Sequence, residues 1–200
     1  MSEPTHDLNA LRQAIVSGDP SQAMPALARL RDVPEAEAIP LLLLGLQQSP
    51  FMVRSLGCAG LGVKRSEEAW AALVEAMEGD PDANVRAEAS SALASYGVER
   101  SWPLLWAQFE KDGHWLVRCS ILSALADQPA MPMAWLLELA RLAVEDADGT
   151  VRTSGAEVLV RVVREGVEVQ TTSEARGILV NLQSDGDHRV VAAALNGLQG

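Results

Sequence analysis

The sequence predicts an all-α protein, an α-solenoid of about six stacked helix pairs. The first observation behind this prediction is a Val-Arg pair that recurs at intervals of 32, 32 and 34 residues, at Val53-Arg54, Val85-Arg86, Val117-Arg118 and Val151-Arg152. The second is the helical spacing of apolar residues on both sides of the turn before each pair. The third is a weaker fifth copy, in which Val191 stands in place of the arginine. One helix pair cannot bury its apolar face alone, so neighbouring pairs must stack.

The repeat around Val85 illustrates the two helices. The first is expected over residues 66–77, where apolar residues recur at helical spacing. A turn follows at residues 80–84, in which Asp80 or Asp82 can cap the next helix by accepting backbone N–H groups. The apolar stripe of that second helix consists of Val85, Ala89, Ala92 and Leu93.

The same pattern, extended along the chain, predicts six pairs in a single domain of residues 1–200. They fall at roughly 5–33, 35–64, 66–98, 99–129, 132–165 and 172–200. Asp19 and Pro20 suit the N-cap and first position of the second helix of the first pair. A longer connection precedes the last pair, where Thr171 and Glu174 have the spacing of a capping box.

Acidic residues recur with the arginines. An aspartate lies six residues before the arginine position in four copies, while the copy at Arg54 has Gln48 there. We expect each aspartate to accept N–H groups at the start of the second helix and to pair with an arginine of a neighbouring repeat. The predicted ladder consists of Arg54, Asp80, Arg86, Asp112, Arg118, Asp146 and Arg152, with Asp185 as the last aspartate.

Composition excludes several classes of function. The formal net charge is −11, from 27 acidic and 16 basic side chains, whereas a nucleic-acid groove needs clustered cations. No apolar run approaches the roughly 20 residues that cross a bilayer, so no membrane span is expected. Cys58 and Cys119 lie on different predicted helices, which argues against a disulfide and predicts a reducing, cytoplasmic compartment.

One stretch carries a family resemblance. Residues 80–93 contain Asp-Pro, a short turn, Val-Arg and then spaced Ala, Ala and Leu. This pattern resembles the HEAT-like repeat named after phycobilisome lyases, and residues 49–55, 60–66 and 114–122 look like cyanobacterial members of that group. The resemblance covers about residues 35 to 165. It implies a HEAT-like solenoid, and the group includes bilin lyases, chaperone-like factors for phycobiliproteins and simple adaptors.

A candidate binding surface follows from helical geometry. Positions two and six residues after the repeat valine point away from the predicted core, and nearly all of them carry small side chains: Ser55, Ala59, Ala87, Ser91, Cys119, Ser123, Thr153 and Glu157. Two interpretations remain open. The small residues leave an open groove for a helix or a flat ligand, or they only permit close packing of the helices.

Trp115 and Cys119 are the side chains on this surface with distinctive chemistry. Trp115 stands at the start of a second helix and offers area for an interface or for stacking on a conjugated ligand, although many such tryptophans belong to the core. Cys119 is a weak catalytic candidate, because Arg118 beside it would favour the thiolate. The alternative is an exposed cysteine without a catalytic role. Trp102 and Trp106 share one helix face, and Trp70 and Trp135 are expected in the core.

Two enzyme classes with this kind of fold are set aside. The three histidines are scattered without metal-ligand spacing, so no metal site is expected. HEAT-like di-iron hydroxylases carry His-Glu dipeptides, which this chain lacks. HEAT-like DNA glycosylases use a basic groove, whereas Lys64 and Lys111 are the only lysines here.

Two functional hypotheses remain. The first is a non-catalytic scaffold or adaptor for a protein partner, for example a phycobiliprotein or another HEAT-like chain in phycobilisome assembly or turnover. The second is a bilin lyase or lyase subunit that attaches an open-chain tetrapyrrole to a phycobiliprotein cysteine, with the bilin as a bound ligand. The first needs no cofactor. An apolar edge at the last helix, around Leu195 and Leu198, can also recruit another chain and form a dimer.

Overall fold

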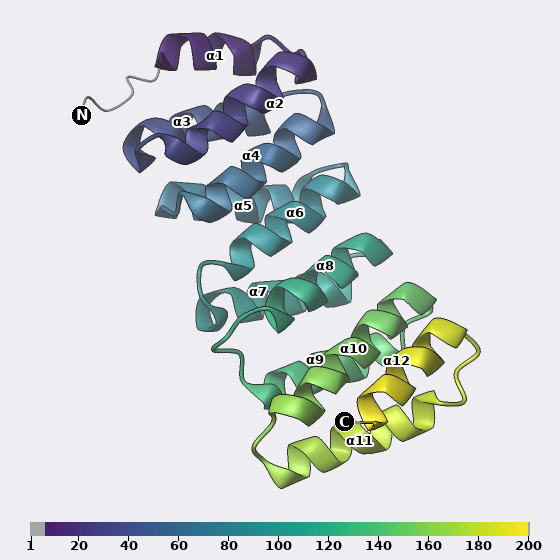
Figure 1. Ribbon diagram of the computed structural model, residues 1–200. Coiled ribbons are helices and arrows are strands. Elements are labelled where there is room, and N and C mark those ends of the chain that lie inside the picture. Colours follow the sequence, from purple (N-terminus) through teal and green to yellow (C-terminus); the bar gives the residue numbers. More distant parts are fainter. Residues whose placement is uncertain (1–6, 200) are drawn as a thin grey trace. The chain divides into compact units, whose positions relative to one another are not determined.

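The computed structural model describes residues 7–199, and in this part of the chain all regular structure is helical (Figure 1). The helices are α1 Leu8–Val16, α2 Pro20–Arg29, the 3-10 helix η1 Leu30–Asp32, α3 Glu35–Leu46, α4 Phe51–Val63, α5 Glu67–Gly79, α6 Ala83–Ala94, α7 Val98–Lys111, α8 Trp115–Ala126, α9 Met133–Val144, α10 Gly149–Glu165, α11 Val169–Leu182 and α12 His188–Leu198. The predicted fold class, an α-solenoid of about six helix pairs, is confirmed. The predicted limits at residues 5 and 200 lie outside the described residues.

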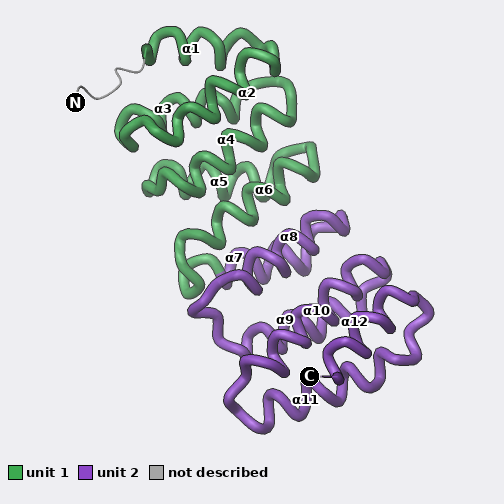
Figure 2. Tube along the Cα trace, in the orientation of Figure 1, with its two compact units in different colours: residues 1–101 green, residues 102–200 purple. Residues whose placement is uncertain are grey.

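The chain divides into two compact units, residues 1–101 and residues 102–200 (Figure 2). The division falls within α7. Unit 1 contains the three pairs α1/α2, α3/α4 and α5/α6, and unit 2 contains α8 and the pairs α9/α10 and α11/α12. A single continuous domain stays a prediction.

Each unit is a two-layered stack in which odd-numbered and even-numbered helices form separate rows. In unit 1, α3 packs against α1 and α5, while α4 packs against α2 and α6. In unit 2, α10 packs against α8 and α12, and α9 packs against α11. Large apolar side chains such as Leu42, Leu61, Leu73, Ile121 and Leu136 are fully buried. Their burial is the main source of stability in such a stack.

Side-chain caps begin the even-numbered helices other than α4, whose N-cap is Pro50 without a side-chain hydrogen bond. The cap lies four residues before the repeat arginine, where Asp82, His114 and Asp148 each accept a backbone N–H. Asp187 plays the same part for α12. The choice between Asp80 and Asp82 is thus decided in favour of Asp82 as the N-cap of α6.

The start of the last pair differs from the prediction. Helix α11 begins at Val169, three residues before the predicted start, and its N-cap is Glu168. Thr171 therefore lies in the first turn, where its hydroxyl donates to the Glu168 carboxylate at 3.1 Å. The capping box with Thr171 as N-cap is wrong, because Glu168 takes the flanking position one turn earlier in the chain.

Glycine allows close helix contact in unit 2. A Cβ at Gly155 of α10 would lie 2.8 Å from the Ala143 Cβ of α9 and 3.1 Å from the Val144 backbone nitrogen. Only a hydrogen fits in that space.

Among the described residues, no helix is long and apolar enough to cross a membrane.

Candidate functional site

The arginines and aspartates of the repeat meet across neighbouring helix pairs. In unit 1 the Arg54 guanidinium binds the Asp80 carboxylate through two parallel hydrogen bonds, with Nε–Oδ2 at 2.7 Å and Nη2–Oδ1 at 3.0 Å. Its third nitrogen donates to the Gln48 carbonyl at 3.0 Å. The same guanidinium thus joins two helix pairs and closes the turn before its own helix.

Unit 2 contains two more such pairs. Arg118 Nε lies 2.7 Å from Asp146 Oδ2, and Arg152 binds Asp185 through two contacts of 2.9 Å. The aspartates also accept the backbone N–H two residues further on, as Asp146 does from Asp148 at 2.8 Å. Each carboxylate therefore organises its own turn while it binds the arginine of the preceding repeat.

Arg86 and Asp112 are the remaining members of the predicted ladder. Arg86 Nη1 donates to the Asp80 carbonyl at 3.0 Å. Asp112 is buried and accepts the His114 backbone N–H and the Gln108 side-chain amide, both at 2.9 Å. Arg86 belongs to unit 1 and Asp112 to unit 2, so their pairing stays a prediction.

The even-numbered helices of unit 1 carry a hollow, here called the even-helix groove. Its volume is about 310 Å³, and it is lined by Met24 of α2, by Phe51, Met52, Ser55, Leu56 and Ala59 of α4, and by Asn84 and Glu88 of α6. Phe51 and Met52 are 38% and 43% exposed, so two adjacent large apolar side chains stand beside the hollow. Small side chains at Ser55 and Ala59 keep the centre of the groove open.

A second apolar hollow continues from this groove. It has a volume of about 380 Å³ and shares Leu56 and Ala59 with the first. Its other lining residues come from α2, η1, α3 and α4 and from Lys64 just after α4; most are apolar, such as Leu27, Leu30 and Val63, and two are the cations Arg31 and Lys64. Together the two hollows extend along α4.

Sequence reasoning singled out Ser55 and Ala59 but missed the side chains that make the groove distinctive. Phe51 stands two residues before the repeat valine, which is the position of Trp115 in its own repeat. That equivalence was a signal that could have found Phe51. Glu88 had no such signal, because its significance depends on burial beside α4.

One predicted surface residue is not on the surface. Ala87 is buried, with 6% of its area exposed, whereas the helical wheel predicted an outward position. Buried residues of α6 occur at nearly every angle around the helix, from Val85 to Ala94, so a side chain as short as alanine does not emerge. Ser91, one turn further on, is half-buried.

The predicted surface residues of unit 2 lie on α8 and α10. Trp115 is 41% exposed, and its ring stacks on His114 with centroids 5.9 Å apart. Ser123 and Glu157 are exposed, while Thr153 is half-buried and donates its hydroxyl to the Gly149 carbonyl. The sequence predicted one continuous groove from Ser55 to Glu157. This stays a prediction, because Ser55 belongs to unit 1 and Glu157 to unit 2.

Cys119, the weak catalytic candidate, is half-buried on α8. Burial raises the pKa of the Cys119 thiol, and this effect outweighs the charge of Arg118. The Ser154 hydroxyl lies 3.5 Å from Cys119 Sγ. These contacts do not favour the thiolate, because Arg118 is engaged by Asp146 and the thiol is half-buried, and a catalytic role of Cys119 stays a weak prediction.

The tryptophans form two groups that support packing. Trp102 of α7 stacks on Trp135 of α9 with centroids 5.0 Å apart, and it lies 5.2 Å from Trp106. In unit 1, the Arg100 guanidinium covers the Trp70 ring at 3.9 Å from its centroid. Trp70 and Trp135 were expected in the core, but both are half-buried. Arg100 lies over the Trp70 ring, and Trp102 stacks on Trp135.

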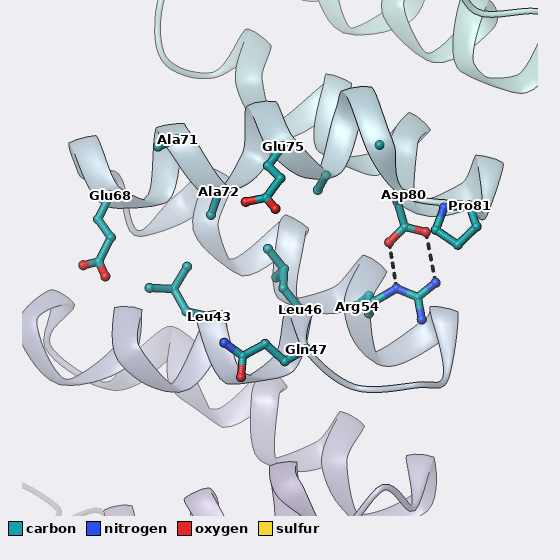
Figure 3. Close-up of a pocket in the computed structure, with 12 residues that line it drawn as sticks. Leu43, Leu46, Gln47, Arg54, Glu68, Ala71, Ala72, Glu75, Asp80 and Pro81 are labelled. Carbon is teal, nitrogen blue, oxygen red and sulfur yellow. Dashed lines mark hydrogen bonds and ion pairs between the residues drawn. The ribbon is translucent and has the colours of Figure 1, made fainter.

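The odd-numbered row of unit 1 contains a larger pocket of about 710 Å³ (Figure 3). Leu43 and Leu46 of α3 form one wall, and α5 contributes small alanines and the exposed Glu68 and Glu75 to the other. The Arg54–Asp80 pair lies at one end, as the dashed lines in Figure 3 show. Within the described residues, no group of three or more His, Cys, Asp or Glu side chains could hold a metal ion.

Stacked helix pairs joined by Asp–Arg pairs define the class of fold, which is an α-solenoid of the HEAT and armadillo kind. Residues 39–126 match the family model of HEAT repeats. No protein of curated function matches the chain.

Three solved structures share the fold. A designed armadillo repeat protein is 18% identical with a TM-score of 0.56, and the match covers 96% of this chain and 99% of that one. An engineered protein is 18% identical with a TM-score of 0.59, and the match covers 98% of each chain. The complex of CpcE and CpcF of phycocyanin lyase from Nostoc sp. PCC7120 is 19% identical with a TM-score of 0.59, over 98% of this chain and 77% of that one. At such identities the likeness defines the fold alone.

Proposed function

We propose that this chain is a non-catalytic scaffold that binds a protein partner through the even-helix groove of unit 1. The observation that carries the proposal is the pair of exposed apolar side chains, Phe51 and Met52, at the edge of a hollow of about 310 Å³. Interface anchors are typically large apolar or aromatic residues beside a pocket that the partner fills. The groove lies on a rigid stack, which keeps these anchors in position before binding.

The neighbouring apolar hollow supports the same proposal. Leu56 and Ala59 line both hollows, so a partner that crosses them meets a continuous apolar strip on α4. An extended strip of this kind suits a helix or an extended segment laid along the stack. The partner that we propose is a phycobiliprotein or another HEAT-like chain, and the similarity of the fold to the phycocyanin lyase complex supports that choice.

Affinity capture with surface variants tests this function. Met52→Asp places a charge on the apolar edge, and the matched control Val16→Asp changes a similarly exposed apolar residue of α1 in the same unit. We expect Met52→Asp to reduce the yield of the specific partner at least tenfold, because a buried unpaired charge at an interface is costly. Val16→Asp should leave the yield unchanged.

A third variant separates the two grooves of unit 1. Ala71→Asp adds a charge to the pocket between α3 and α5. If this substitution prevents capture and Met52→Asp does not, the partner binds the odd-numbered row and our assignment is wrong. Equal thermal stability of the three variants is the control for correct folding.

A bilin-binding role is the second candidate. It is favoured by the likeness to the phycocyanin lyase complex, together with the exposed Trp115 ring, whose face can stack on a conjugated system. In such a role the chain would hold an open-chain tetrapyrrole, and the accepting thiol would belong to the substrate phycobiliprotein. Catalysis would then rest on orientation of the two reactants and would need no nucleophile on this chain.

Titration with an open-chain bilin distinguishes this role from the scaffold. Saturable quenching of tryptophan fluorescence with a shifted bilin absorption band, weakened in Trp115→Ala, would support bilin binding. Absence of saturable binding at micromolar bilin would exclude this second candidate. Trp102→Phe serves as the control, because the Trp102 ring already contacts the rings of Trp106 and Trp135.

A further inference from the structure

The even-helix groove contains one charged side chain, Glu88. It comes from α6 and lines the hollow together with Phe51 and Met52 of α4. Glu88 is half-buried, and among the described residues it makes no ion pair or hydrogen bond. Burial raises the pKa of its carboxyl group, and no neighbouring cation counteracts this effect.

The repeat itself does not need a carboxylate here. The position three residues after the repeat valine is Leu56, Glu88, Ser120 and Ser154 in successive repeats, so Glu88 is the only charged residue in this set. By contrast, the repeat aspartates form ion pairs with arginines, at Asp80, Asp146 and Asp185. Glu88 is therefore a carboxylate whose presence the stacking of repeats does not explain.

Coverage of this groove by a partner would remove water from Glu88. A neutral apolar partner would leave the carboxylate without compensation, which is unfavourable in a desolvated site. A lysine or arginine above Glu88 would replace the lost water with a charge-assisted hydrogen bond. The net charge of −11 would also attract a cationic segment during encounter.

We propose that the partner segment bound in the even-helix groove carries a lysine or arginine that pairs with Glu88, flanked by apolar side chains that contact Phe51 and Met52. This inference rests on the proposed function and specifies the chemistry of the partner. The Asn84 side chain is exposed in the same groove one turn before Glu88; its amide nitrogen donates to Asp82 Oδ1 at 2.9 Å, and its carbonyl oxygen can accept from the backbone of such a segment.

Selection from a random twelve-residue peptide library tests the proposal. Peptides are enriched on the wild-type chain and then measured against Glu88→Gln and Met52→Asp, with Glu75→Gln as the matched control from an exposed position of α5. We expect groove-binding peptides, defined as those lost on Met52→Asp, to share one basic residue between apolar ones. Glu88→Gln should weaken them about tenfold or more, whereas Glu75→Gln should have no effect.

Charge reversal gives the decisive comparison. A selected peptide whose basic residue is replaced by glutamate should lose binding to the wild-type chain and regain it on Glu88→Lys. If groove-binding peptides lack a basic residue, or bind wild type and Glu88→Gln equally, the pairing with Glu88 is refuted while the groove remains a binding site. If no enriched peptide is sensitive to Met52→Asp, the groove is not a binding site, and the proposed function fails with this inference.

Discussion

Two glycine-to-alanine substitutions in unit 2 should change stability in opposite directions. Alanine in a helix interior is favoured over glycine by about 0.5–1 kcal/mol, because glycine loses more backbone entropy on folding. At Gly177 of α11 an added Cβ meets no atom within 4 Å, so Gly177→Ala should gain this full amount. At Gly155 of α10 the same Cβ would lie 2.8 Å from Ala143 Cβ and 3.1 Å from the Val144 nitrogen.

Neither of those neighbours can rotate away. Ala143 has no rotamer, and the Val144 nitrogen belongs to the backbone of α9, so the two helices must separate. Overpacking of this kind costs about 1–3 kcal/mol, which exceeds the gain in helix propensity. Gly155→Ala should therefore be destabilising by roughly 0.5–2 kcal/mol.

Thermal unfolding followed by far-ultraviolet circular dichroism measures both effects. For a chain of this size, about 1 kcal/mol shifts Tm by roughly 2–4 °C, so the Tm should fall in Gly155→Ala and rise in Gly177→Ala. Both positions lie in unit 2, so each variant reports on the same unit even if the two units unfold separately. A Gly155→Ala protein as stable as wild type would refute the packing argument for α9 and α10.

Three further outcomes follow from the ion pairs and the thiols. The Arg152 guanidinium holds the pKa of Asp185 below its ordinary value of 3.8, so the stabilisation is full above that value and is lost as the pH falls through the lower folded-state pKa. Asp185→Asn should cost about 1–2 kcal/mol in urea unfolding at pH 7, and a gap that persists in strong acid would contradict this cause. Alkylation of Cys119 by iodoacetamide at neutral pH should be slower than that of a cysteine in a short peptide, because burial raises its pKa; a faster rate would restore the case for a thiolate. Burial raises the pKa of Cys58 to about 12, so mass spectrometry should find it alkylated only after unfolding.

Sequence periodicity predicted most of the fold because the physical causes are local. The Val-Arg spacing, the apolar stripes and residues such as Asp19 and Asp82 that begin helices act within a few positions of the chain. The start of α11 was misplaced because Thr171 and Glu174 have the spacing of a capping box, whereas the helix begins after Glu168 without a side-chain cap.

The candidate site was harder to predict, because exposure depends on the helices that surround each residue. A helical wheel treats Ala87 and Ser55 as equivalent, yet Ala87 is buried while Ser55 lines a groove. A wheel describes one helix, and it contains no account of neighbouring side chains. The raised pKa of Cys119 has the same origin, since burial within unit 2 outweighs the adjacent arginine.

The sequence by itself determined the helix pairs, their number and order, and the residue types of the Asp–Arg ladder, because repeated local patterns specify repeated local structure. The tertiary structure alone decided which arginine meets which aspartate, as Arg54 meets Asp80 and Arg152 meets Asp185. It also brought Glu88 of α6 and Phe51 of α4 to the same groove, which neither helix could form alone. These contacts join residues from different repeats, and their distances depend on how the helices stack.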